Sequence, residues 1–250
     1  MNSPPLVCDS CNSLLANNGA DLPRRKFLAL LGAALSLPAL GRTAEKGAPP
    51  KPQNVISSDA ALERLMKGNN RYVHGNMQRH DFAAERAALA KGQNPFASIL
   101  SCADSRIGPE FAFDAGRGDI FVCRIAGNFA SAEMIASLEY SVAVLNSPLI
   151  LVLGHQACGA VDSTIKQVKD GASFPGQIPS LTEALTPAVQ AVANQPGDLL
   201  VNAIKENVVL TVQKLQSAEP ILSDAVNQKK LKVVGGVYDL KTGKVELVNS

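Results

Sequence analysis

The stretch FASILSCADSR (residues 96–106) decides the fold, because a short apolar run ends directly in sulfur-bearing and charged side chains. A similar arrangement recurs in LILVLGHQAC (residues 149–158), and a third apolar run covers residues 120–123. Runs of this length predict buried strands, and the helical pattern at 133–145 separates the last two. Strands that alternate with helices predict a parallel sheet. We therefore expect an α/β protein with a mostly parallel central sheet flanked by helices.

Helical patterns extend on both sides of these strands. Apolar residues repeat at helical spacing after the candidate caps at 57–59, and a second amphipathic piece covers 81–91. Residues 181–228 are mostly helical in pattern, and we expect interruptions at three prolines, Pro187, Pro196 and Pro220. Residues 231–240 and 244–248 predict a strand and a hairpin.

Composition and charge limit the class of protein. The chain has 250 residues, 46% of them hydrophobic, and a formal net charge of +2. This length suffices for one domain with a substantial core plus appendages, and we expect that domain at 54–250. The small net charge and the lack of a basic run argue against nucleic-acid binding. A folded, nearly neutral enzyme is the favoured interpretation.

The N-terminal 41 residues resemble an export signal. Arg24-Arg25-Lys26-Phe27-Leu28 precedes an apolar run to Leu40, the order found in twin-arginine signals, and residues 39–41 offer a small-residue cleavage site. The run is shorter than the roughly 20 residues that span a bilayer, so no membrane span is expected in the mature chain. We predict a signal at 1–41, a flexible linker at 42–53 and export to the bacterial periplasm. A basic amphipathic terminus of a cytoplasmic protein is the alternative.

Three residues of the two polar stretches form a candidate metal site: Cys102, His155 and Cys158. Two thiolates and an imidazole suit zinc, and three protein ligands leave the fourth tetrahedral position open, as in catalytic zinc sites. A structural zinc or three simply buried residues are the alternatives, but Asp104 is the only further ligand offered nearby. Cys8-x-x-Cys11 is assigned no role, and Cys123 is interpreted as a small buried apolar residue.

Asp104 and Arg106 follow the first cysteine within one turn. The Asp104 carboxylate is placed to orient a metal-bound water, and Arg106 is placed to hold that carboxylate through charge-assisted hydrogen bonds. We also hypothesise that Asp104 competes between Arg106 and the metal and closes the site at lower pH. An ion pair that only shapes the loop is the alternative.

The two motifs, Cys-x-Asp-x-Arg and His-x-x-Cys, make the chain resemble the β-class carbonic anhydrases. Shorter segments add to the likeness, among them 62–65, 68–73, 118–121, 124–128 and 235–239. The resemblance implies one zinc ion per subunit, whose bound hydroxide attacks CO₂ to form bicarbonate and a proton. It also implies a homodimer or a dimer of dimers in which N-terminal helices at 59–91 pack on the partner.

The resemblance further implies three substrate-binding residues. Gln93 lies nine residues before Cys102, Tyr140 fifteen before His155, and Gly159 directly after Cys158. Ile99 occupies the position of a tryptophan that belongs to a non-catalytic bicarbonate site in one branch of the family, which makes that site and the closure by Asp104 less expected here. Two alternatives stay open: hydrolysis of carbonyl sulfide or carbon disulfide on the same scaffold, and a non-catalytic zinc-buffering or thiol-redox protein.

Overall fold

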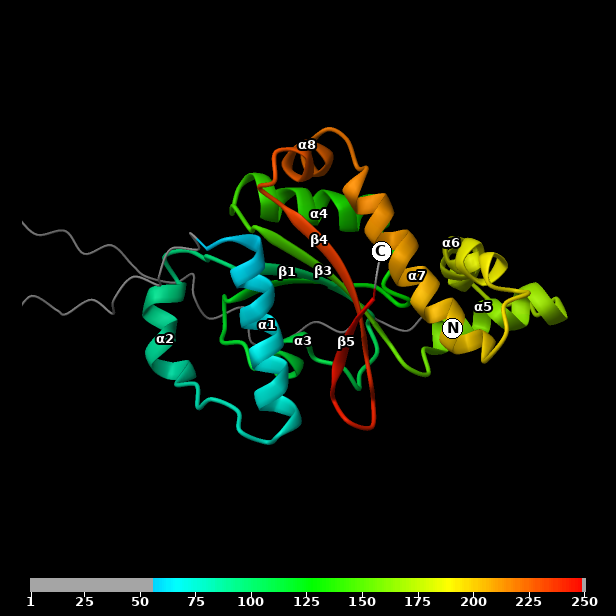
Figure 1. The fold of residues 1–250 in the computed structure, drawn as a ribbon, viewed down its shortest axis with the longest axis horizontal. Coiled ribbons are helices and arrows are strands. Elements are labelled where there is room, and N and C mark those ends of the chain that lie inside the picture. Colours follow the sequence, from blue (N-terminus) through cyan, green and yellow to red (C-terminus); the bar gives the residue numbers. More distant parts are fainter. Residues whose placement is uncertain (1–55, 249–250) are drawn as a thin grey trace, which may run out of the picture. The chain divides into compact units, whose positions relative to one another are not determined.

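The computed structural model describes residues 56–248, which belong to one compact unit. A five-stranded sheet with the order β2-β1-β3-β4-β5 forms its centre (Figure 1). The strands are β1 (Ala97–Ser101), β2 (Ile120–Arg124), β3 (Leu149–His155), β4 (Lys232–Tyr238) and β5 (Val245–Val248). The first four pair in parallel and β5 pairs with β4 in antiparallel fashion, so the expected mostly parallel sheet is confirmed.

Every residue of the two central strands, β1 and β3, is buried. Their mostly apolar character follows from this position, because a parallel strand covered on both faces has no side that faces solvent. The register pairs Ser98 with Ile150 and Ser101 with Leu153, which brings the carboxyl ends of β1 and β3 to the same edge of the sheet. That edge carries the candidate site.

Eight helices surround the sheet in the described part of the chain. They are α1 (Ser58–Val73), α2 (Phe82–Leu89), α3 (Pro109–Ala112), α4 (Ala132–Ala143), α5 (Gly159–Asp170), α6 (Ile178–Ala191), α7 (Leu199–Gln216) and α8 (Ile221–Asn227). The helices expected after the candidate caps at 57–59, at 81–91 and at 133–145 are confirmed. The four-residue helix α3 has no counterpart among the sequence-based expectations, because a single turn is too short to show periodicity.

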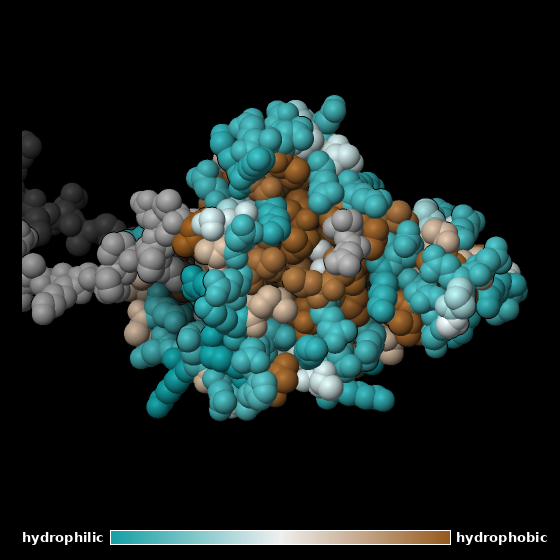
Figure 2. All heavy atoms as spheres, viewed as in Figure 1, coloured by the Kyte–Doolittle hydropathy of each residue, from teal (hydrophilic) through white to brown (hydrophobic). Residues whose placement is uncertain are grey.

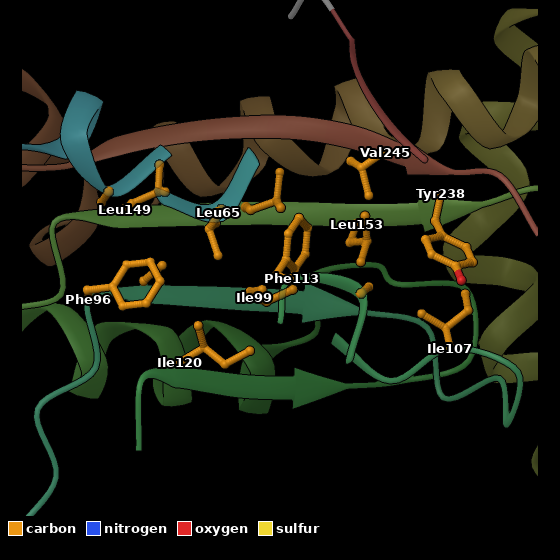
Figure 3. Packing of buried hydrophobic residues seen from close by; sticks show 14 residues of the cluster. Leu65, Phe96, Ile99, Ile107, Phe113, Ile120, Leu149, Leu153, Tyr238 and Val245 are labelled. Atoms are coloured by element: carbon orange, nitrogen blue, oxygen red, sulfur yellow. The ribbon is translucent and has the colours of Figure 1, made fainter. Parts of the chain in front are cut away.

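One face of the sheet packs against α1 and α3. In Figure 3, Phe113 lies beside Leu65 of α1 and Ile99 of β1 in this apolar layer. The opposite face packs against α4, α7 and α8 through Leu138, Val208 and other buried residues. Helices α5 and α6 pack beyond the carboxyl ends of the strands (Figure 1). The expectation of helices flanking the sheet is therefore confirmed.

The interruption expected at Pro187 is wrong. Pro187 lies inside α6, which continues to Ala191. A proline in a helix interior removes one backbone hydrogen bond, but the neighbouring Leu185, Ala188 and Val189 are buried, and their packing holds the helix in place. The breaks expected at the other two prolines are confirmed, because Pro196 lies between α6 and α7 and Pro220 caps α8.

Asn69 fastens α1 to the β4-β5 hairpin. Its side chain is buried and donates to the carbonyls of Ala112 and Gly243 at 2.9 and 2.8 Å, and it accepts from the Val245 N–H at 2.9 Å. In contrast, α2 has no buried residue, and Phe82 at its start is 50% exposed. The apolar side of α2 is thus only partly covered by the described residues of the same chain.

Several expectations concern residues outside the described range. The signal at 1–41, the linker at 42–53 and the Cys8-x-x-Cys11 pair all lie there. Among residues 56–248, no helix is both long and apolar enough to cross a membrane.

Candidate metal centre

The fold brings Cys102, His155 and Cys158 together. Cys102 follows the last residue of β1, His155 is the last residue of β3, and Cys158 is the N-cap of α5. Because β1 and β3 are parallel neighbours, both strands deliver their next residues to the same edge of the sheet. All three side chains are buried, and their ligand atoms lie within 4.8 Å of one another.

The donor set fits a metal ion. His155 is fully buried, its Nδ1 contacts the Gln156 carbonyl at 2.8 Å, and its Nε2 has no hydrogen-bond partner among the described residues. A buried polar atom without a partner is costly, whereas a metal-binding imidazole commonly uses one nitrogen for the ion and the other for a backbone carbonyl. The tautomer that donates from Nδ1 leaves the Nε2 lone pair facing the two sulfurs.

The sulfurs of Cys102 and Cys158 lie within 4.8 Å of one another, and each shifts the pKa of the other. The Cys158 thiol donates a hydrogen bond toward Cys102 and lowers the pKa of Cys102 well below its ordinary range, and the Gly127 N–H acts in the same direction. The pKa of Cys158 rises for the reciprocal reason, that it holds the shared proton, and burial adds to this rise. A divalent ion bound there would replace that proton and stabilise both thiolates.

Asp104 lies at the edge of the ligand group, paired with Arg106. The Arg106 guanidinium donates to both carboxylate oxygens, at 2.9 and 2.7 Å, and also to the Ala157 carbonyl at 3.2 Å. These bonds keep the pKa of Asp104 below its ordinary range. Asp104 Oδ2 lies 3.8 Å from His155 Nε2, so an ionised carboxylate borders the space between the three ligand atoms.

Arg124 at the end of β2 supports the loop that carries Cys102 and Asp104. Its guanidinium donates to the carbonyls of Cys102, Asp104 and Ile107 at 3.0, 2.6 and 2.8 Å. In the sequence, Arg124 belongs to the segment 124–128 that carries the family resemblance, and no role for it is evident there. The signal was a basic residue directly after an apolar strand, but its carbonyl partners are set by tertiary packing.

The remaining site residues predicted from the sequence lie in different places. Gly159 begins α5 directly after Cys158 and therefore lies beside the ligand group. Gln93 is exposed and precedes the amino end of β1, whereas Cys102 follows its carboxyl end, about 16 Å away along five strand residues. Tyr140 on α4 is 48% exposed, and its ring lies 6.3 Å from that of Phe121 on β2. The single chain does not bring Gln93 to its own ligand group.

Comparisons with known proteins agree with this geometry. The sequence model of a family described as carbonic anhydrase matches residues 97–245. The chain is 38% identical over 190 residues to carbonic anhydrase 2 of Mycobacterium tuberculosis, covering 75% of this chain and 91% of the relative. It is 36% identical over 190 residues to a carbonic anhydrase of Mycolicibacterium smegmatis, covering 75% and 92%.

Solved structures show the same fold. A tetrameric β-carbonic anhydrase from Sordaria macrospora superimposes with a TM-score of 0.61 at 22% identity, covering 76% of this chain and 98% of that one. The Coccomyxa β-carbonic anhydrase in complex with acetazolamide gives a TM-score of 0.59 at 25% identity, covering 75% and 86%. From its sequence relatives, its sheet and its Cys-His-Cys group, the chain belongs to the β class of the carbonic anhydrase family.

Proposed function

We propose that the protein catalyses the reversible hydration of carbon dioxide to bicarbonate and a proton, with one zinc ion per subunit held by Cys102, His155 and Cys158. The observation that carries this proposal is the buried three-residue donor set, which has an ionised carboxylate at its edge and no fourth protein ligand among the described residues. Catalytic zinc sites have three protein ligands and an open position, whereas structural sites are closed by four.

Asp104, Arg106 and Gly159 have separate roles around the ion. Zinc, when bound, supplies a Lewis acid that brings the pKa of water toward neutrality, although two thiolates make it a weaker acid than three imidazoles would. Asp104 accepts a hydrogen bond from the attacking oxygen and fixes its orientation toward the substrate carbon. Arg106 holds both oxygens of Asp104 and keeps this carboxylate ionised. The Gly159 N–H, in the first turn of α5, is free to donate to a bound anion.

Stopped-flow hydration of CO₂ tests the activity directly. The zinc-loaded protein is expected to acidify CO₂-saturated buffer, to lose this activity with a chelator and to regain it with Zn²⁺. Carbonyl sulfide and carbon disulfide serve as competing substrates, and faster turnover of either would favour the hydrolase alternative. A chelator-insensitive protein that reduces disulfides would instead support the thiol-redox alternative and overturn the zinc lyase.

We propose further that the working unit is a homodimer or a dimer of dimers. A substrate contact by Gln93 requires a second subunit, because Gln93 lies at the opposite end of β1 from its own Cys102. An apolar groove of about 540 Å³ next to α2, lined by Met77, Phe82 and Phe111, offers a surface for the partner, and these side chains are 42 to 65% exposed. Another groove, of about 420 Å³, lies between α7 and β5, and we propose it as a surface on which two dimers could pair.

Apolar residues are also exposed on the face between α1 and α7, over β4 (Figure 2).

Sedimentation velocity on the full chain tests the proposed assembly. Phe82→Glu is expected to shift the protein toward monomers and to lower CO₂ hydration, whereas Val168→Glu, at a 38% exposed position on α5, serves as the control. A wild-type monomer with full activity would contradict the dimer.

We also propose that the protein is exported to the periplasm by its twin-arginine segment. The support is the sequence Arg24-Arg25-Lys26-Phe27-Leu28 ahead of an apolar run. Replacement of both arginines by lysine is expected to leave the protein in the cytoplasmic fraction of a bacterial host, while the wild type appears in the periplasmic fraction. Equal distribution of the two forms would refute the signal.

A further inference from the structure

The turn after β2 places a backbone donor on the sulfur of Cys102. The Gly127 N–H donates to Cys102 Sγ at 3.3 Å, and both residues are buried. Gly127 has φ +85°, in the left-handed region that favours glycine. A Cβ at this position would lie 2.7 Å from Leu185 Cδ1 on α6, so the backbone is closely approached by that helix.

The same glycine is held from the other side by α7. The Asn207 Nδ2 donates to the Gly127 carbonyl at 2.8 Å, across 80 residues of sequence. Asn207 is only 4% exposed, so the bond is shielded from water. Hydrogen bonds of this kind fix the orientation of a residue that itself contacts a metal ligand. The chain of contacts therefore runs from Asn207 through Gly127 to Cys102.

We propose that Asn207 is a positioning residue of the metal centre, which holds Gly127 so that its N–H stays directed at the Cys102 sulfur. This inference rests on the proposed zinc function. A hydrogen bond to a thiolate draws charge away from the sulfur, so the sulfur donates less charge to the ion, and the ion remains a stronger Lewis acid. Two thiolate ligands weaken the Lewis acidity of the ion, and this acidity limits the activation of water. The hydrogen bond to Cys102 would partly restore it.

The backbone environments of the two sulfurs differ. Cys158 is the N-cap of α5, and its side chain makes no cap hydrogen bond there. The donor for Cys102 belongs to a separate turn and depends on a side chain from α7. The Gly127 donor can therefore be weakened by a single substitution on α7, at a residue outside both motifs.

A measurement on the wild-type protein tests the contact between the Gly127 N–H and the Cys102 sulfur. In ¹¹³Cd-loaded, ¹⁵N-labelled protein, we expect a scalar coupling between the cadmium nucleus and the amide proton of Gly127, because the coupling passes through an N–H···S bond. Cadmium bound by both sulfurs without such a coupling would overturn the inference. This readout requires no variant and no turnover.

Two variants test the contact between Asn207 and the Gly127 carbonyl. Asn207→Leu removes the donor in a side chain of similar size, and Asn207→Asp keeps the shape while replacing Nδ2 with oxygen. The matched control is Thr211→Val, one turn further along α7 at a position that is also 4% exposed. Both Asn207 variants are expected to lose the Gly127 coupling and to move the thiolate charge-transfer band of the Co²⁺-loaded protein to lower energy. Thr211→Val is expected to change neither.

Kinetics provide an independent readout. Substitution of an outer-shell partner typically costs about 10- to 100-fold in metal affinity or activity. We expect kcat/KM of CO₂ hydration to fall about 10-fold at pH 7 in Asn207→Leu and to recover at alkaline pH, because a weaker Lewis acid shifts the activity profile upward. A folded Asn207→Leu with an unchanged band and profile would overturn the inference while leaving the proposed function intact. Failure of the wild type to bind Co²⁺ and Cd²⁺ would overturn both.

Discussion

At the residue scale, the carboxylate of Asp104 is prepared as an acceptor by its neighbour. Arg106 donates to both of its oxygens and lowers its pKa, so Asp104 stays ionised as the pH falls from neutral into the mildly acidic range. The side chain is therefore charged at every pH at which hydration of CO₂ would be assayed. Its position, 3.8 Å from His155 Nε2, places that charge at the ligand group rather than in bulk solvent.

Asp104→Asn tests this role. The substitution removes the charge, and we expect kcat/KM for CO₂ hydration to fall about 100-fold or more at neutral pH, the usual effect of removing a positioned proton acceptor. Zinc content, measured by mass spectrometry, is expected to remain at one ion per subunit because Asp104 is not among the three ligands. Asp162→Asn on α5, which removes an exposed carboxylate paired with Lys166, is the control. Unchanged hydration in Asp104→Asn would remove Asp104 from the mechanism.

At the element scale, α1 is tied to the sheet by one buried amide. Asn69 joins three backbone groups, from Ala112, Gly243 and Val245, so it links α1 to α3 and to the hairpin that closes the sheet. A backbone group that is buried without a hydrogen-bond partner destabilises the native state by more than one formed hydrogen bond stabilises it. The stability of this corner therefore depends on a polar contact inside an apolar layer.

Asn69→Ala is expected to lower the free energy of unfolding by about 3 kcal/mol, because it leaves three buried backbone groups without their side-chain partner. Asn70→Ala changes the adjacent, exposed residue of the same helix and is expected to cost less than about 1 kcal/mol. Urea unfolding of the zinc-loaded protein measures both. Equal losses in the two variants would show that helix propensity, rather than the buried contact, sets the cost.

At the scale of the whole molecule, the three candidate metal ligands come from segments that are far apart in the sequence. Cys102 follows β1, while His155 and Cys158 lie at the end of β3 and the start of α5. An ion bound by all three would hold the centre of the sheet to the helices beyond its carboxyl edge. Binding to the native state alone raises stability by mass action.

Removal of the metal is therefore expected to destabilise the fold. At a free zinc concentration about 1,000 times the dissociation constant, the native state gains about 4 kcal/mol, and a chelator should abolish this gain and lower the Tm. Differential scanning calorimetry with and without chelator measures the shift. Cys102→Ser, which removes one ligand, is expected to show little further loss on chelation; a large chelator effect in that variant would place the stabilising ion elsewhere.

The strands and the ligand group were predictable for local reasons. Apolar runs ending at Ser101 and Leu153 marked β1 and β3, and parallel neighbours bring their carboxyl ends together by topology alone. The break expected at Pro187 failed because burial of one side of α6 outweighs the loss of a single backbone hydrogen bond. A residue's local preference does not decide the structure where burial of its neighbours stabilises the helix by more than that preference costs.

The amino-acid sequence by itself determined the donor types, their spacing and the alternation of strands and helices, because these properties belong to short segments and to side-chain chemistry. Only the tertiary structure decided that Gly127 donates to Cys102 and that Asn207 donates to the Gly127 carbonyl. Contacts between segments 80 residues apart depend on how the layers pack, and the local apolar pattern does not show which residues of two distant segments meet.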